Sequence, residues 1–434
     1  MHSDTVTDKT FKDLGVSKPY LVSALEYFNF EYSSPPQKES IPRALKGQNL
    51  VVQAKNGTGK TLAFVCIMLE LLEEASSVPQ VLVVTATREI ANQVFDFVNE
   101  MTFESSSVVY SVLCCGGYSR KDTINNLKQG AHILIGTVGR LKDMIQNNYA
   151  KLDQVKLLVL DEADKVASSL SWLFPKVPNA QTLCFSATYS EDSLQFLRKH
   201  VSFEMLKCHG DDLKLHHLKE YHLECGSTMQ SKVAQVLYTL HTVNFQQAIV
   251  FYNKKGTGNE LASKLRAEGF PCLFISGDMP QAQRLHVVQS LRFLGIKVML
   301  STDLTSRGID VLNVNLVVNY EVPTSKEVYL HRVGRAGRYG TPGMAVTLVE
   351  NQEAASSLSQ FSVTDDFKNF TPEPLEETFV YPVNLNELQA LKVENIEDFF
   401  GSECELCKLN TYGSHCHCQI CLENYQVMVK YLVS

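Results

Sequence analysis

Residues 54–61 read Ala-Lys-Asn-Gly-Thr-Gly-Lys-Thr and stand between a short apolar run, Leu50–Gln53, and a helical pattern. In such a loop, glycines let backbone N–H groups curl around phosphates, and the following helix adds a positive dipole. Lys60 would reach the β- and γ-phosphates of a nucleotide, and the Thr61 hydroxyl would bind Mg²⁺. Ala54 stands where the pattern has glycine, and a loop without phosphate is the alternative. The pattern predicts a site for ATP and Mg²⁺ formed by Ala54, Lys55, Asn56, Gly57, Thr58, Gly59, Lys60 and Thr61.

Two carboxylates follow a second apolar run, Leu157–Leu160. Asp161 can hold Mg²⁺ directly or through water, and Glu162 is placed to orient and deprotonate an attacking water. Phosphoryl transfer needs this division of labour, because the metal neutralises charge while a base positions the nucleophile. Alone, these residues could form a solvated acidic turn. Downstream of a phosphate loop, they predict a catalytic pair for ATP hydrolysis.

Residues 331–338, which read His-Arg-Val-Gly-Arg-Ala-Gly-Arg, carry three arginines separated by small residues. One interpretation is a solvated basic face. The other is that Arg335 and Arg338 reach the γ-phosphate across a cleft between two units, because the guanidinium is planar and always charged. Such arginines raise the rate by about 10³–10⁵ in related phosphoryl-transfer systems. The catalytic site would then be complete only when two units close, which would couple ATP to the shape of the protein.

These side chains need a sheet to position them, and short apolar runs separated by helical patterns recur along the chain. Runs that are apolar throughout suit strands covered on both faces, and alternation with helices indicates a parallel sheet. The first set is Leu50–Gln53, Val81–Thr85, Val108–Cys115, His132–Thr137, Leu157–Leu160 and Thr182–Phe185. The second set is Ala248–Phe251, Cys272–Ile275, Val298–Leu300, Leu316–Val318 and Met344–Val349. We therefore predict an α/β fold of two tandem units, with ligands at the carboxyl ends of the strands.

Composition excludes intrinsic disorder as the main state, because 44% of the 434 residues are hydrophobic and 20% are charged. The net charge of −7 comes from 40 basic and 47 acidic residues and argues against a strongly basic nucleic-acid binder. However, residues 351–434 carry 4 basic and 13 acidic residues, so the tail has −9 and the rest of the chain +2. The body of the chain is therefore near neutral and offers no constant electrostatic attraction to nucleic acid. The acidic tail could repel nucleic acid, meet a protein partner or be a solvated linker.

The chain has no apolar run long enough for a membrane span and no apolar signal core near its first residues. We therefore expect an intracellular protein whose twelve cysteines are mostly reduced. Cys66, Cys114, Cys115, Cys184 and Cys272 lie in apolar runs and are expected to be small core residues. In the tail, Cys404, Cys407, Cys418 and Cys421 form two Cys-x-x-Cys pairs. A structural Zn²⁺, unliganded thiols and a disulfide all remain open for them.

Over residues 11–350 the chain resembles the DEAD-box family of RNA helicases, which have two RecA-like domains with parallel sheets. Residues 29–37 resemble its Q motif, and residues 85–91, 116–117, 137–140 and 186–188 resemble the motifs that follow in the first domain. In the second unit, residues 249–253, Gln281 with Arg284, and residues 301–310 resemble the later motifs. Departures from the family pattern are Asn29, Ser33, Ala86, Ile90 and Val138.

The resemblance implies roles for individual residues. Gln37 would read adenine with Phe11 stacked on it, while Gly308 and Asp310 would lie at the nucleotide. Coupling of ATP hydrolysis to strand separation is implied for Asp164, Ser186, Thr188 and His331. An RNA strand would be held by its phosphates and 2′-hydroxyls, without base reading, through Arg88, Gly117, Thr137, Arg140, Arg284, Thr302, Asp303 and Arg307.

The resemblance also implies how the chain is divided. Residues 1–40 would be an N-terminal segment with the Q motif, 41–207 the ATP-binding RecA-like domain, 208–219 a linker and 220–355 the helicase C-terminal RecA-like domain. Residues 356–400 would form an acidic linker, and residues 401–434 a Cys/His-rich tail that could be a zinc knuckle.

The function implied is that of an ATP-dependent RNA helicase that clamps, remodels or locally unwinds RNA. Several strings are most similar to the Gemin-three subfamily, the DEAD-box subunits of the survival-of-motor-neuron (SMN) complex: residues 53–55, 301–310 and 314–319. This implies SMN complex proteins as partners, small nuclear ribonucleoprotein assembly as the setting, and a location in cytoplasm and nucleus. The short stretch between Asp164 and Ser186 and the short tail depart from that subfamily. The alternatives are an ATP-gated RNA-binding scaffold that barely unwinds, and a DNA helicase.

Overall fold

The structure is a computed structural model that describes residues 7–76, 78–103, 109–208, 218–254, 256–292, 296–303, 313–336, 342–361, 363 and 365–370. The chain divides into two compact units, with the boundary between His217 and Leu218. We describe each unit by itself. No helix within these ranges is long and apolar enough to cross a membrane. The four tail cysteines of the two Cys-x-x-Cys pairs lie outside the described residues.

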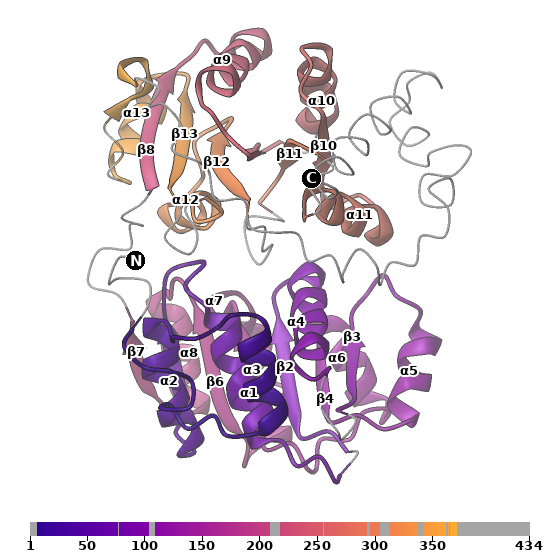
Figure 1. Cartoon of the computed structure of the whole chain (residues 1–434). Helices are drawn as coiled ribbons and strands as arrows, with labels where there is room; N and C mark the ends of the chain where they lie inside the picture. The colour runs from indigo at the N-terminus through magenta and orange to yellow at the C-terminus, as the bar shows by residue number, and fades with distance from the viewer. Residues whose placement is uncertain are drawn as a thin grey trace. The chain divides into compact units, whose positions relative to one another are not determined.

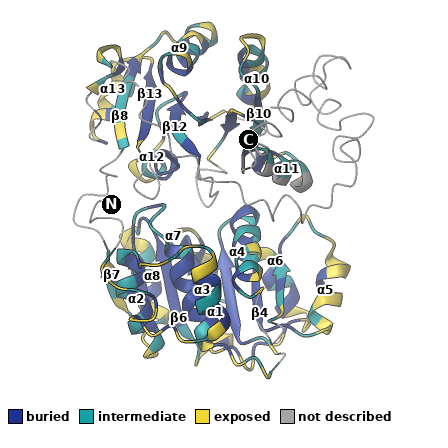
Figure 2. Cartoon of the chain, viewed as in Figure 1, coloured by how far each residue is buried: buried dark blue, intermediate teal, exposed yellow. Residues whose placement is uncertain are grey.

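The first unit is built on seven parallel strands in the order β3-β4-β2-β5-β6-β1-β7 (Figure 1). The strands are β1 Leu50–Gln53, β2 Val81–Thr85, β3 Ser111–Cys114, β4 Ile133–Thr137, β5 Leu157–Asp161, β6 Gln181–Ser186 and β7 Glu204–Lys207. The central strands are buried along their whole length, as Figure 2 shows, because helices cover both faces of the sheet. This explains why they are apolar throughout instead of alternating.

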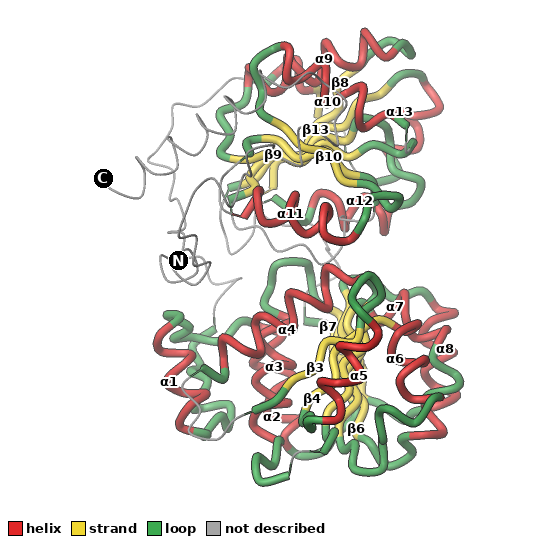
Figure 3. The backbone as a smooth tube through the Cα atoms, turned by 90° about the vertical axis from the view of Figure 1, so that its right-hand side faces the viewer, coloured by secondary structure: helices red, strands yellow, loops and turns green. Residues whose placement is uncertain are grey.

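Helices of the first unit lie in two layers, one on each face of the sheet (Figure 3). One layer contains α1 Pro19–Tyr27, α2 Pro35–Leu45, α3 Lys60–Leu71 and α4 Arg88–Met101. The opposite layer contains α6 Val138–Gln146, α7 Ala163–Val166 and α8 Glu191–His200, and α5 Arg120–Lys128 follows the edge strand β3. The side chains of Thr87, Ser119 and Ser190 cap α4, α5 and α8 by accepting a backbone N–H, which sets where these helices begin.

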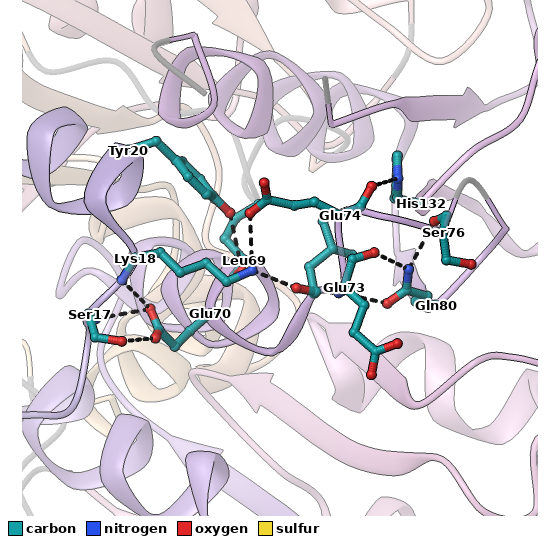
Figure 4. A network of polar contacts seen from close by, with 11 residues as sticks. Ser17, Lys18, Tyr20, Leu69, Glu70, Glu73, Glu74, Ser76, Gln80 and His132 are labelled. Atoms are coloured by element: carbon teal, nitrogen blue, oxygen red, sulfur yellow. Dashed lines mark hydrogen bonds and ion pairs between the residues drawn. The ribbon is translucent and has the colours of Figure 1, made fainter. Parts of the chain in front are cut away.

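Helix α1 is tied to the carboxyl end of α3 by a polar network (Figure 4). The Glu70 carboxylate accepts the backbone N–H groups of Ser17 and Lys18 at 3.0 and 3.2 Å. The Lys18 ammonium donates to the Leu72 carbonyl at 2.5 Å, and the Tyr20 hydroxyl donates to the Leu69 carbonyl at 3.2 Å. The Lys18 and Tyr20 side chains therefore satisfy carbonyls at the end of α3 that have no intrahelical partners. The phosphate loop lies at the other end of α3.

The second unit repeats the architecture with seven parallel strands in the order β10-β11-β9-β12-β13-β8-β14. The strands are β8 Leu218–Glu224, β9 Gln247–Phe251, β10 Cys272–Ile275, β11 Val298–Ser301, β12 Val314–Asn319, β13 Gly343–Val349 and β14 Asp365–Asp366. Helices α9 Met229–Thr242 and α10 Thr257–Ala267 cover one face, and α11 Gln281–Arg292 and α12 Lys326–Val333 cover the other (Figure 3).

The second unit continues beyond residue 355, into the segment for which the sequence suggested a linker. Helix α13, Gln352–Ser359, is followed by β14, which pairs in parallel with β8. The next turn places Phe367 in the core with no exposed surface, stacked on Phe370 and edge-on to Tyr221. Two aromatic side chains therefore fix this segment to the edge of the sheet.

The five cysteines expected in the core are free and buried. Burial raises the pKa of the Cys66 and Cys184 thiols well above the usual value, because a thiolate would lose its hydration there. They are therefore inert core residues, as the sequence predicted.

Candidate nucleotide and RNA sites

The phosphate loop joins β1 to α3 and has the backbone shape that its glycines permit. Gly57 and Gly59 have φ angles of +71° and +86°, in the left-handed region that other residues rarely adopt. A Cβ atom on Gly59 would also lie 2.3 Å from Nε2 of Gln37. Ala54 has no positive φ, is 1% exposed and donates its N–H to the Ser186 carbonyl at 3.1 Å. The first position of this loop therefore does not require glycine.

Lys60 fills the centre of the loop. Its ammonium donates to the carbonyls of Ala54 and Lys55 at 2.7 and 3.1 Å, and to Oδ1 of Asn56 at 3.3 Å. Thr58 closes the turn by donating its hydroxyl to the Lys55 carbonyl at 2.7 Å. At the start of α3, no side chain of the described residues caps the helix, since its N-cap is Gly59. A buried cation at the N-terminus of a helix fits the phosphates of a nucleotide.

The Q-motif segment is held against this loop by Gln37. Its Oε1 accepts the Ser34 N–H at 2.7 Å, and its Nε2 donates to the Gly59 carbonyl at 3.1 Å. Asn29, which stands where the family has glycine, has a φ of +57°, so asparagine adopts the left-handed conformation itself. Phe11, expected to stack on adenine, is 4% exposed and belongs to the core that α1–α4 share with the sheet.

Asp161 and Glu162 lie at the carboxyl end of β5, and β6 separates β5 from β1. They are 7% and 4% exposed, and Glu162 has a φ of +50°, a strained conformation for a residue with a side chain. Burial and, to a smaller extent, the Glu162 charge raise the pKa of the Asp161 carboxyl to about 7, although the Lys60 ammonium opposes both effects. A buried carboxyl in contact with a second acid fits a divalent cation, which would take the place of the proton. Thr61, in the first turn of α3, carries a hydroxyl that would serve as a further ligand.

Asp164 and Ser186 join the carboxylates to the phosphate loop. The Ser186 hydroxyl donates to Oδ1 of Asp164 at 2.7 Å, while the Ser186 carbonyl accepts the Ala54 N–H. Thr188 follows two residues later and is 7% exposed. Parallel register places Gln53 beside Ser186 and Asp161 beside Phe185, so these groups share one edge of the sheet.

The predicted RNA contacts of the first unit lie at the same edge, beyond β2, β3 and β4. Arg88 begins α4, and a Cβ atom on Gly116 would lie 3.0 Å from its Nη2. Gly117 has a φ of +90°, and Thr137 ends β4. Arg140, in α6, donates to the Tyr118 carbonyl at 3.0 Å and to the Thr123 hydroxyl at 3.1 Å. Backbone and cationic groups are therefore gathered where a phosphate chain could bind.

In the second unit, the structure assigns Asp303 a partner within the protein. Its Oδ1 accepts from Nε of Arg332 at 2.6 Å, and Nη2 of Arg332 donates to Oδ1 of Asn253 at 2.7 Å. The Arg332 side chain is fully buried and lies over the Phe251 ring at 5.4 Å. Sequence reasoning gave no role to Arg332 or Asn253, although both stand within the quoted motifs.

The other candidates of the second unit lie in different settings. Arg335 is 3% exposed and donates its Nε to the His331 carbonyl at 3.2 Å, and His331 is fully buried. Arg284 is 6% exposed, and Thr302 directly follows β11. The remaining predicted residues lie outside the described residues: Arg307, Gly308, Asp310 and Arg338.

Comparison with known proteins agrees with this architecture. Residues 34–196 match the DEAD/DEAH box helicase family, and residues 231–340 match the helicase conserved C-terminal domain. The chain is 33% identical over 351 residues to ATP-dependent RNA helicase eIF4A of Debaryomyces hansenii, covering 79% of this chain and 87% of that protein. It is 36% identical over 351 residues to mouse probable ATP-dependent RNA helicase DDX20, covering 78% of this chain and 42% of that protein.

Among solved structures, Saccharomyces cerevisiae Dbp5 bound to RNA and ADP BeF3 is similar, with a TM-score of 0.74 and 27% identity, covering 88% of this chain and 98% of that one. Two parallel-sheet α/β units with a phosphate loop and paired carboxylates define a helicase of the RecA-like type. The chain belongs to the DEAD-box family of ATP-dependent RNA helicases.

Proposed function

We propose that this chain is an RNA-stimulated ATPase that uses ATP and Mg²⁺ to clamp RNA and open short duplexes locally. The observation that carries the proposal is the grouping in the first unit of Lys60, Asp161 and Glu162 at one edge of the sheet. RNA as the partner is supported by the cationic and glycine residues that continue along this edge. It is also supported by the similarity to Dbp5 bound to RNA.

In the proposed reaction, the oxygen of a water molecule attacks the γ-phosphorus of ATP, and the bond to the leaving ADP oxygen breaks. The Glu162 carboxylate orients this water and accepts its proton. Lys60 exchanges its bonds to loop carbonyls for bonds to the β- and γ-phosphates. Mg²⁺, held by Thr61 and Asp161, supplies charge neutralisation at the phosphates when bound. We propose that Arg335 and Arg338 add charge stabilisation at the γ-phosphate, because the guanidinium is planar and always charged.

The experiment is an ATPase assay with and without single-stranded RNA on the full chain. Lys60→Ala should abolish turnover because it removes the phosphate-binding cation, and Glu162→Gln should abolish it because an amide cannot accept the proton. Lys199→Ala and Glu191→Gln are matched controls on the exposed face of α8 and should retain wild-type turnover. Wild-type turnover in Lys60→Ala or Glu162→Gln would contradict the mechanism.

Two alternatives are separated by parallel assays. An ATP-gated scaffold would hydrolyse ATP and bind RNA but would not displace the strands of a short duplex. Strand displacement in a parallel assay would therefore exclude the scaffold, and its absence would support it. A DNA helicase would be stimulated by DNA more than by RNA. Intact Lys60, Asp161 and Glu162 favour an active enzyme.

We also propose that the chain acts within the cell with SMN complex proteins in small nuclear ribonucleoprotein assembly. The support is the resemblance of residues 53–55, 301–310 and 314–319 to the Gemin-three subfamily, together with the 36% identity to mouse DDX20. Relatives named eIF4A have similar identity, so the subfamily needs its own test. Affinity purification with mass spectrometry should recover SMN and other gemin subunits. Their absence would remove this proposal and leave the helicase proposal in place.

A further inference from the structure

Tyr118 directly follows Gly116 and Gly117, the two glycines proposed to contact RNA. It links this turn, which follows β3, to helices α4 and α6. Its hydroxyl donates to Oδ1 of Asn92, in α4, at 2.6 Å. The same amide donates its Nδ2 to the Arg88 carbonyl at 2.8 Å, so its orientation is fixed at both ends. The Tyr118 carbonyl accepts from Nη2 of Arg140, in α6, at 3.0 Å. The ring packs against the core cluster under α4.

We infer that Tyr118 is a positioning residue for the RNA backbone: its hydroxyl holds the Gly116-Gly117 turn against α4, and its carbonyl holds the Arg140 guanidinium. This inference rests on the proposed RNA-binding function and deepens it. Two successive glycines leave a turn with many accessible conformations, and Gly117 occupies one with a positive φ. The anchor on the next residue restricts the turn before RNA arrives, so less ordering is required on binding.

The charge pattern agrees with a role in positioning. Arg140 has both of its described bonds on neutral oxygens, the Tyr118 carbonyl and the Thr123 hydroxyl. Neutral partners orient a guanidinium without cancelling its charge. The Asp143 carboxylate, whose pKa is lowered mainly by Arg120 and to a smaller extent by Arg140, is hydrogen-bonded to Arg120. Burial raises the pKa of the Tyr118 hydroxyl, with the Asn92 hydrogen bond opposing that change, so the phenol keeps the proton that it donates.

The decisive variant is Tyr118→Phe, which keeps the ring and removes only the donated bond. We expect the RNA concentration for half-maximal ATPase stimulation to rise about 3- to 10-fold, the range of one lost hydrogen bond. The KM for ATP, the ATPase rate without RNA and the maximal stimulated rate should stay at wild-type values. Tyr110→Phe, at an exposed tyrosine at the start of β3, is the matched control and should change none of these values.

A double-mutant cycle tests whether the bond acts through Asn92. Asn92→Ala should weaken RNA binding, measured by fluorescence anisotropy of a labelled single-stranded RNA, and Tyr118→Phe should add little to it. If Tyr118→Phe binds RNA like wild type, or if the two effects are fully additive, the inference is wrong. A base-stacking role would also leave Tyr118→Phe silent and would overturn it. If the wild-type chain neither binds RNA nor shows RNA-stimulated ATPase activity, the proposed function is wrong. If the wild-type chain binds RNA and Tyr118→Phe binds it equally well, only the inference about Tyr118 is wrong.

Discussion

At the scale of single residues, the buried acid pair creates a conflict between stability and chemistry. Asp161 is almost fully buried beside Glu162, and its pKa lies near 7, whereas an unfolded aspartate titrates near its ordinary value of 3.8. Between these two values the folded state binds more protons than the unfolded state. The free energy of unfolding therefore falls as the pH rises through this window. The nucleotide-free protein is destabilised at neutral pH by the residue proposed to hold Mg²⁺.

This predicts that Asp161→Asn stabilises the chain in the absence of nucleotide and Mg²⁺. The gain should be on the order of 1–4 kcal/mol at pH 8, where the wild-type carboxyl is ionised, and should vanish near pH 4, where it is neutral. Thermal unfolding at the two pH values measures it. Asp153→Asn, at an exposed site in the same unit, should change the melting temperature at neither pH. A variant less stable than wild type at pH 8 would show that Asp161 is stabilised by contacts that outweigh its burial.

The residues proposed for the nucleotide site could be predicted from the sequence, because their spacing follows from the chemistry of phosphates. Lys60 and Asp161 were predicted from local strings, and the structure places them at the same edge of the sheet, after β1 and at the end of β5, with β6 between these strands. By contrast, Arg332 and Asn253 form their bond only when β9 and α12 come together, and no local pattern indicates that distance. Residues 301–310 resemble a motif that contacts RNA, and this resemblance suggested an RNA contact for Asp303. Nothing in these residues indicates the ion pair that Asp303 forms with Arg332.

At the scale of elements, the strands with apolar sequences could be predicted, and the charged strands β7 and β8 could not. The run Leu157–Leu160 became β5 almost unchanged, because a strand covered on both faces must be apolar throughout. The edge strand β7 is partly exposed and carries charged residues, and so does β8, which lies between β13 and the two-residue strand β14. The sequences of β7 and β8 therefore resemble loops. The distinction arises from burial, since only strands whose side chains are covered by the core must be apolar.

Packing between β9 and α10 leads to a prediction about Gly258. A Cβ atom there would lie 2.3 Å from the hydroxyl oxygen of the fully buried Tyr252 and 2.7 Å from its Cζ. Gly258→Ala should therefore destabilise the second unit by about 1–3 kcal/mol, the range for overpacked cores. Gly256→Ala is the matched control, because no described atom lies within 4 Å of its Cβ position and its φ is −70°.

The cause can be isolated with a second substitution measured by chemical denaturation. Adding Tyr252→Ala removes the atoms that the new methyl group meets, so the double variant should be less destabilised than the sum of the two single variants. Additive losses would mean that Gly258 is required for a reason other than its contact with Tyr252.

At the scale of the whole molecule, the acidic excess of the chain belongs mainly to residues beyond 350, yet part of that stretch completes a folded unit. Phe367 is fully buried and β14 extends the second sheet by pairing with β8. The composition of residues 351–370 gives little sign of this, because three phenylalanines, at 361, 367 and 370, in a largely polar stretch do not form a periodic pattern. The charge count therefore places the start of the tail at residue 351, whereas the packing of Phe367 and β14 extends the second unit to residue 370.

The contribution of this segment can be measured by comparing a chain that ends at Phe370 with one that ends at Glu350. The shorter chain lacks α13, β14 and Phe367 and leaves the β8 edge and the Tyr221 ring uncovered. We expect it to lose thermal stability relative to the longer chain, since removing a buried phenylalanine side chain alone costs about 3–5 kcal/mol. Phe367→Ala in the full chain should reproduce most of this loss. Lys368→Ala, which breaks only an exposed ion pair with Glu224, should leave the melting temperature nearly unchanged. Equal stability of the two truncated chains would place the boundary of the second unit at residue 350.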